Sequence, residues 1–105
     1  MAERISPEDG VIKLQSGDTL FVDVRDPASH QEARIPGALL LNQANLQDFL
    51  AATDRQQPLV VYCYHGHSSQ GASDYLAEQG FHSVVSLDGG FEHWRQAHPE
   101  HVDSE

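Results

Sequence analysis

Cysteine is almost absent from this chain, which has Cys63 as the only one among its 105 residues. A single cysteine excludes an intramolecular disulfide and a zinc site built from four cysteines. A lone free thiol is typical of the reducing cytoplasm, and we therefore expect a cytoplasmic protein.

Long apolar runs are also missing. No stretch approaches the roughly 18–20 consecutive apolar residues that a membrane helix needs. The first residues, Met1–Arg4, lack the basic start and the apolar stretch of a signal peptide. We expect neither a membrane span nor secretion.

Basic side chains are scarce. Six Lys and Arg face sixteen Asp and Glu, and the formal net charge is −10. Such a surface repels a polyanion, so we expect no nucleic-acid partner. With 39% apolar residues the chain is long enough for one core. We predict a single domain over residues 1–105, with its core at about 5–98 and a frayed tail at 99–105.

Short apolar runs alternate with stretches of helical pattern. We expect strands at 19–24, 39–41, 58–62 and 84–87. We expect helices at 6–17, 26–33 and 45–53, a fourth from the end of the turn at 64–69 to residue 80, and a last one after 90. Ser6 and Asn45 are the expected N-caps of two of these helices, and Tyr75 is expected on a buried helix face. The run at 58–62 has no polar alternation, as in a parallel strand covered on both faces. The pattern predicts an α/β fold with a mostly parallel sheet.

Cys63 follows the buried run at 58–62 and precedes a helix. In open parallel sheets, sites lie beyond the carboxyl ends of the strands. The loop from Tyr64 to Ser69 can point backbone N–H groups inward, and Gly66 permits a tight turn. A helix N-terminus lowers the pKa of a thiol and also attracts an anion. The segment therefore predicts a reactive thiolate beside an anion pocket, although many lone cysteines are merely buried apolar residues.

The polar residues of this loop allow more than one interpretation. His65 and His67 could act as bases or hydrogen-bond donors, or could simply be solvated. Together with Cys63 they lie too close in one turn to surround an ion, and we expect no metal and no cofactor. Ser68 and Ser69 could donate to substrate oxygens or cap the helix.

Asp23 and Arg25 lie at the end of the run at 19–24. Arg25 could attract an anionic substrate. Alternatively, the two residues could hold neighbouring loops by an ion pair and hydrogen bonds. We favour the structural interpretation, because charged pairs at strand ends commonly fix loops.

Several short motifs together resemble one family. They are Asp23-Val24-Arg25, Ile35-Pro36-Gly37-Ala38, the Cys63 loop, and Asp88-Gly89-Gly90-Phe91 followed by Trp94. In order and spacing they resemble the rhodanese domain from about Ile5 to His98. The resemblance implies a rhodanese-like three-layer fold, with a five-stranded, mostly parallel sheet and helices on both faces.

The resemblance also implies a reaction. Cys63 would take the outer sulfur of thiosulfate, become a persulfide and release sulfite. A thiophilic acceptor, cyanide or a dithiol such as thioredoxin, would then remove the sulfur. The loop Tyr64, His65, Gly66, His67, Ser68 and Ser69 would bind the substrate.

The chain departs from the family pattern at two places. Arg34 stands where many rhodaneses have His, and Tyr64 stands where many have Arg, so the loop has no fixed cation. A rival cysteine phosphatase would need an Arg six residues after the cysteine, and Ser69 stands there. The other alternative is a non-catalytic rhodanese-like module that carries sulfur, senses redox state or binds a protein.

Overall fold

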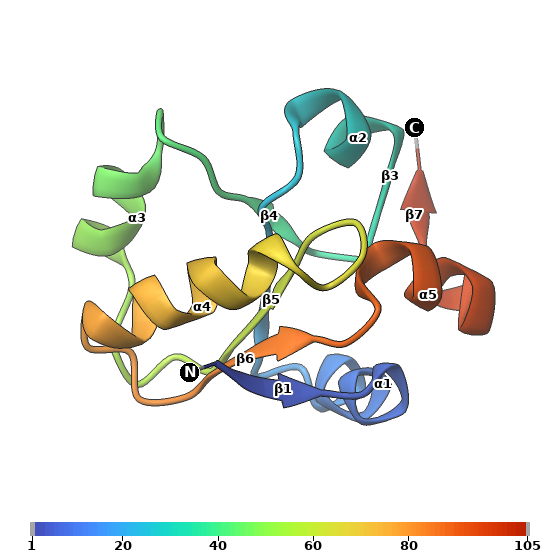
Figure 1. Ribbon diagram of the computed structural model, residues 1–105, viewed down its shortest axis with the longest axis horizontal. Helices are drawn as coiled ribbons and strands as arrows, with labels where there is room; N and C mark the ends of the chain where they lie inside the picture. The colour runs from blue at the N-terminus through green and yellow to red at the C-terminus, as the bar shows by residue number, and fades with distance from the viewer. Residues whose placement is uncertain (1, 105) are drawn as a thin grey trace.

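The computed structural model describes residues 2–104, and its centre is a five-stranded parallel sheet. In spatial order the strands are β1 (Glu3–Ile5), β6 (Val84–Leu87), β5 (Leu59–Tyr62), β2 (Leu20–Asp23) and β4 (Leu39–Leu40). Every neighbouring pair is parallel. The α/β fold predicted from the sequence is confirmed, and Figure 1 shows β5 in the middle of the molecule.

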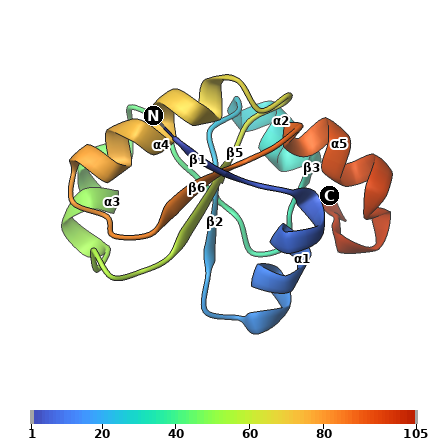
Figure 2. The same cartoon turned by 60° about the horizontal axis from the view of Figure 1, so that its bottom comes forward.

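Helices cover both faces of the sheet, as Figure 2 shows. On one face lie α3 (Leu46–Ala52) and α4 (Ser68–Glu78), and on the other lie α1 (Pro7–Ser16) and α5 (Gly90–Ala97). Each face has its own apolar core, centred on Leu76 and Phe81 in one and on Phe91 and Trp94 in the other. Among residues 2–104 no helix has both the length and the apolar character to cross a membrane.

The capping residues behave differently from one another. Ser6 caps α1 as expected, since its Oγ accepts from the Asp9 N–H at 3.1 Å. Asn45 precedes α3 but makes no side-chain cap. Its Oδ1 accepts from the Asn42 N–H at 2.8 Å, and its Nδ2 donates to the Leu40 carbonyl at 2.7 Å. Asn45 thus occupies the N-cap position as expected, but the expected side-chain cap is wrong, because its amide group already bonds the backbone of Asn42 and Leu40 in the preceding turn.

Residues 3–5 and 99–104, near the two ends of the chain, form more regular structure than the sequence suggested. β1 was not located by the sequence pattern, because three residues at a sheet edge show no clear periodicity. The expected fraying of the C-terminal tail is wrong as far as residue 104. Pro99–His101 form the 3-10 helix η1, and β7 (Asp103–Ser104) pairs antiparallel with β3 (Ala33–Arg34). The indole N–H of Trp94 donates to the His101 carbonyl at 2.9 Å.

Candidate active site

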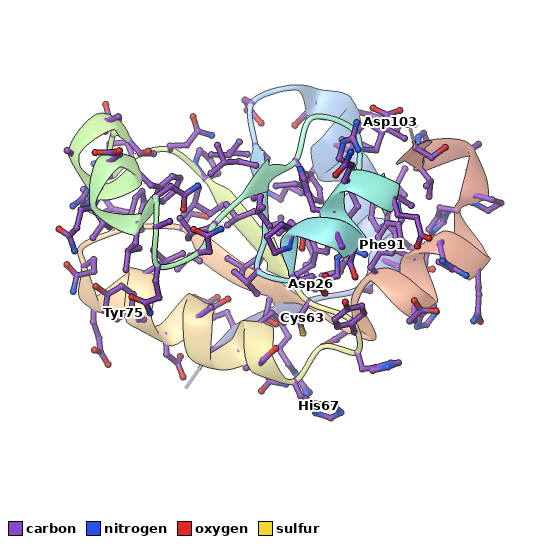
Figure 3. All side chains as sticks on the ribbon, turned by 90° about the horizontal axis from the view of Figure 1, so that it is seen from above. Asp26, Cys63, His67, Tyr75, Phe91 and Asp103 are labelled. Carbon is purple, nitrogen blue, oxygen red and sulfur yellow. The ribbon has the colours of Figure 1, made fainter. Side chains whose placement is uncertain are left out.

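Cys63 lies immediately after β5, at the carboxyl edge of the sheet. Its side chain is 3% exposed. Figure 3 shows it near the centre of this edge, between α4 and α2 (Pro27–Glu32). The loop from Tyr64 to His67 then leads directly into α4, which begins at Ser68.

The N-terminus of α5 holds the carbonyl groups of this loop. The Phe91 N–H donates to the Cys63 carbonyl at 2.8 Å, and the Glu92 N–H donates to the Tyr64 carbonyl at 3.0 Å. This approach requires glycine at position 90, where φ is +62° and a Cβ would lie 2.5 Å from the Tyr64 carbonyl oxygen. The Asp88-Gly89-Gly90-Phe91 motif therefore acts on the site by fixing the loop.

The opposite side of the loop presents hydrogen-bond donors to the sulfur. The N–H groups of Gly66 and Ser69 donate to Cys63 Sγ at 3.2 and 3.3 Å. The hydroxyl oxygen of Ser69 also lies 3.3 Å from Sγ. Gly66 has φ +89°, the left-handed conformation that turns its N–H inward. The sulfur thus lies in a cradle of donors that suits a negative charge.

This cradle sets the ionisation of Cys63. Burial raises the pKa of the thiol. The hydroxyls of Ser68 and Ser69 and the N–H groups of Ser69 and Gly66 lower this pKa, and together they outweigh the effect of burial. The net result is a pKa of about 7. A large share of the cysteine is therefore thiolate at neutral pH, the form in which sulfur is nucleophilic.

The remaining loop side chains point away from the sulfur. His65 and His67 are exposed, and Figure 3 shows His67 at the outside of the molecule, directed away from Cys63. The Tyr64 hydroxyl hydrogen-bonds Asp26 and Ser29 at the start of α2. Across residues 2–104, no three side chains of the metal-binding types are grouped to hold an ion.

Asp23 and Arg25 form a buried ion pair below the loop. Arg25 Nη2 lies 2.7 Å from Asp23 Oδ2 and donates to the Ala33 carbonyl at 2.6 Å. The guanidinium carbon lies 4.3 Å from the centre of the Phe91 ring. Burial raises the pKa of Asp23, but the hydrogen bonds from Arg25 outweigh it and the net pKa is lowered. All these contacts favour the structural interpretation of the pair.

Arg34 does not supply the cation that the loop lacks. Its Nη1 donates to the carbonyls of His30 and Gln31 at 3.1 and 3.2 Å, at the end of α2. The Arg25 guanidinium carbon lies 5.7 Å from the centre of the Tyr64 ring, but Arg25 is 7% exposed and bound to Asp23. The groups found in contact with the sulfur are therefore N–H and hydroxyl groups, within the described residues.

A cavity of about 660 Å³ lies beside the site, between α3 and α4. Leu41, Leu46, Leu76 and Tyr75 are among its lining residues, and Cys63 is not. Tyr75 is 39% exposed at this cavity, so its expected burial is wrong. Tyr75 lines the cavity, and its opening leaves part of the ring in contact with solvent.

One residue near the sulfur was not identified from the sequence. Ser86 of β6 lies 2.8 Å from the Ser69 hydroxyl, oxygen to oxygen. The signal was present as a polar residue within the apolar run Val84–Leu87. Nothing local in the sequence shows that this position faces the Cys63 loop.

Comparison with known proteins identifies the family. The model of the rhodanese-like domain matches residues 6–97, and the chain belongs to this family. It is 48% identical over 101 residues to "Thiosulfate sulfurtransferase GlpE" of Stutzerimonas stutzeri, covering 96% of this chain and 92% of the relative. The protein of the same name from Pseudomonas aeruginosa is 46% identical over 102 residues, covering 97% and 92%.

Solved structures agree on the fold. The solution structure of the rhodanese-like domain of the Anabaena protein Alr3790 superimposes with a TM-score of 0.86 at 20% identity. The match covers 100% of this chain and 81% of that one. The rhodanese-like fold expected from the sequence motifs is thereby confirmed, and the match of the family model over residues 6–97 confirms the family.

Proposed function

We propose that this protein is a thiosulfate sulfurtransferase with Cys63 as its nucleophile. The observation that carries the proposal is the cradle around Cys63 Sγ, with N–H donors at 3.2 and 3.3 Å and the Ser69 hydroxyl at 3.3 Å. Two relatives named for this activity, at 48% and 46% identity, support the choice of thiosulfate as donor.

The first half-reaction loads the enzyme with sulfur. The Cys63 thiolate attacks the outer sulfur of thiosulfate, and a new S–S bond forms at Sγ. The S–S bond of thiosulfate breaks, and sulfite leaves with the electron pair. Sulfite is a stable anion, so the step requires no strong general acid, and the N–H groups of Gly66 and Ser69 remain available to the sulfur atoms.

The second half-reaction returns the free cysteine. A nucleophilic acceptor attacks the terminal sulfur of the persulfide, and the Cys63–sulfur bond breaks to give the thiolate. Cyanide would become thiocyanate. A dithiol such as thioredoxin would first form its own persulfide and then a disulfide, releasing sulfide. A thiol that must stay free suits the reducing cytoplasm, where we place the reaction.

Intact-protein mass spectrometry tests the proposal. Thiosulfate should add the mass of one sulfur atom to the wild-type protein, and cyanide should remove it with formation of thiocyanate. Cys63→Ser should show no adduct and no turnover, because a hydroxyl cannot hold sulfur as a persulfide. Its unfolding midpoint should stay close to that of the wild type, which verifies the fold.

Two other outcomes would point elsewhere. If the wild-type protein forms no sulfur adduct, the proposal fails and the non-catalytic module replaces it. If Cys63-dependent hydrolysis of an aryl phosphate matches sulfur transfer in rate, the phosphatase alternative must be taken up again. We expect no such hydrolysis, because Ser69 occupies the position of the required Arg and its hydroxyl faces Sγ.

A further inference from the structure

A line of hydroxyl groups runs from the Cys63 sulfur into the sheet. Ser69 Oγ lies 3.3 Å from Cys63 Sγ and 2.8 Å from Ser86 Oγ. Ser69 is 0% exposed and Ser86 is 1% exposed, so water does not replace either partner. The loop residue Ser69 is thereby connected to a strand that lies outside the loop.

Ser86 is the one polar residue of β6, whose other members are Val84, Val85 and Leu87. Burying a hydroxyl among apolar residues costs free energy unless the hydroxyl is hydrogen-bonded. The partner of Ser86 Oγ within the described part of the chain is Ser69 Oγ. The Ser86 hydroxyl can therefore act on the site only by donating to Ser69 or by accepting from it.

The direction of these hydrogen bonds depends on the ionisation of Cys63. A thiol can donate its proton to Ser69, but a thiolate can only accept. When Cys63 is ionised, the single hydroxyl proton of Ser69 must point at Sγ if the contact is to be favourable. The Ser69 oxygen is then free to accept, and the Ser86 hydroxyl is the donor that faces it. Bonds aligned in this way polarise and strengthen one another.

We propose that Ser86 is a positioning residue, whose hydroxyl donates to Ser69 and thereby holds the Ser69 proton on the Cys63 thiolate. Ser86 does not touch the substrate, and it acts through Ser69. The ionisation step releases the thiol proton to solvent and reverses both hydrogen bonds, with no other change in bonding. Its value for sulfur transfer rests on the proposed function, whereas its effect on the thiol does not.

Ionisable groups on the surrounding segments could also influence the thiol. They are Asp23 and Arg25 at the end of β2, Asp26 at α2, Tyr64, His65 and His67 in the loop, Asp74 on α4, and Asp88 and His93 around the start of α5. Within residues 2–104, the groups that lower the pKa of the thiol through hydrogen bonds belong to Gly66, Ser68 and Ser69, and none of these three residues is ionisable. A change confined to Ser86 therefore tests the hydrogen-bond chain from Ser86 through Ser69 to Cys63.

The test measures the rate of iodoacetamide alkylation of Cys63 as a function of pH. Ser86→Ala should raise the midpoint of this profile by about half a pH unit, which slows alkylation at pH 7 by roughly twofold. Ser86→Val, which suits a buried strand, should give the same shift if Ser86→Ala folds poorly. Ser86→Thr keeps a hydroxyl and should restore the wild-type midpoint.

A double-mutant cycle tests whether Ser86 acts on the Cys63 thiol through Ser69 or independently of it. Ser69→Ala should raise the midpoint more than Ser86→Ala does. The combination of both should match Ser69→Ala alone, because Ser86 has no other route to the sulfur. Ser73→Ala is the matched control, since Ser73 is also buried on α4 and its hydroxyl has no partner among residues 2–104. This control should leave the midpoint unchanged.

Each outcome decides the proposal. If Ser86→Ala lowers the unfolding midpoint but leaves the alkylation profile unchanged, Ser86 has only a structural role and the proposal is overturned. Additive shifts in the double variant would overturn it as well. If the shifts appear but wild-type protein takes no sulfur from thiosulfate, the proposed function fails while the positioning role of Ser86 stands.

Discussion

Arg25 shows how the surroundings of one residue decide between two roles. The guanidinium is bound to Asp23 and covered by Phe91 and Tyr62, so its charge is directed into the protein. Removing one member of a buried ion pair leaves the other charge uncompensated. Arg25→Ala should therefore lower the free energy of unfolding by about 3 kcal/mol. Chemical denaturation measures this loss.

The pH dependence of stability provides an independent check on the same pair. The pKa of Asp23 is lowered in the folded protein, so its contribution is present above the unfolded value and is lost as the pH falls through the folded pKa. The wild type should therefore gain stability as the pH rises through the acidic range toward the unfolded carboxyl pKa of about 3.9, and Arg25→Ala should lose the part of that gain that Asp23 contributes.

Arg95 is the matched control for Arg25. It is exposed and pairs with Glu92 at 3.6 Å on the surface of α5, so Arg95→Ala should change stability by less than about 1 kcal/mol. If Arg25→Ala leaves stability unchanged while sulfur transfer collapses, Arg25 is a substrate ligand and the structural role is wrong.

At the scale of elements, the site depends on how α5 meets the loop after β5. The N–H groups at the start of α5 bind the carbonyls of Cys63 and Tyr64, and Gly90 provides the necessary space. Gly90→Ala should push the loop away from α5, because its Cβ would lie 2.5 Å from the Tyr64 carbonyl oxygen. We expect a loss of about 2–4 kcal/mol in stability and a slower alkylation of Cys63 at pH 7.

The comparison for this substitution is Gly71→Ala. Gly71 is an exposed residue within α4, and a Cβ there would meet nothing within 4 Å. Alanine favours a helix, so this variant should gain about 0.5–1 kcal/mol. Equal behaviour of the two glycine variants would contradict the close contact between α5 and the loop.

At the scale of the whole molecule, the net charge of −10 opposes the approach of an anion. Salt screens exposed charges beyond about 10 Å at 0.1 M, so added salt should speed the sulfur loading of Cys63 by thiosulfate severalfold. Iodoacetamide is uncharged, and its reaction with the fully ionised thiol should change little. Single-turnover kinetics at increasing ionic strength measures both rates.

The opposite effect of salt would contradict the expected repulsion of thiosulfate by the acidic surface. If loading slows with salt while alkylation does not, thiosulfate is guided by a local positive potential. The exposed histidines His65 and His67 would then be the first side chains to substitute, because no Lys or Arg occurs between Arg55 and Arg95.

Local patterns predicted much of the architecture. Four strands of the sheet and the five principal helices lie where apolar spacing and turn residues placed them, because periodicity depends only on neighbouring residues. Position after a buried strand and before a helix also pointed to Cys63. The prediction of a frayed tail was wrong, because η1 is held by Trp94 and β7 by β3, and local patterns do not show such contacts.

The sequence alone determined the class of fold and pointed to Cys63 as the candidate nucleophile, because strand and helix patterns and a lone cysteine can be recognised within short windows. The donors around the sulfur were decided by tertiary structure. Gly66 and Ser69 turn their N–H groups inward because α5, more than twenty residues later, binds the outer carbonyls of the loop. Ser86 reaches Ser69 only because β6 pairs with β5. Hydrogen bonds depend on distance in space, and the order of residues along the chain does not specify that distance.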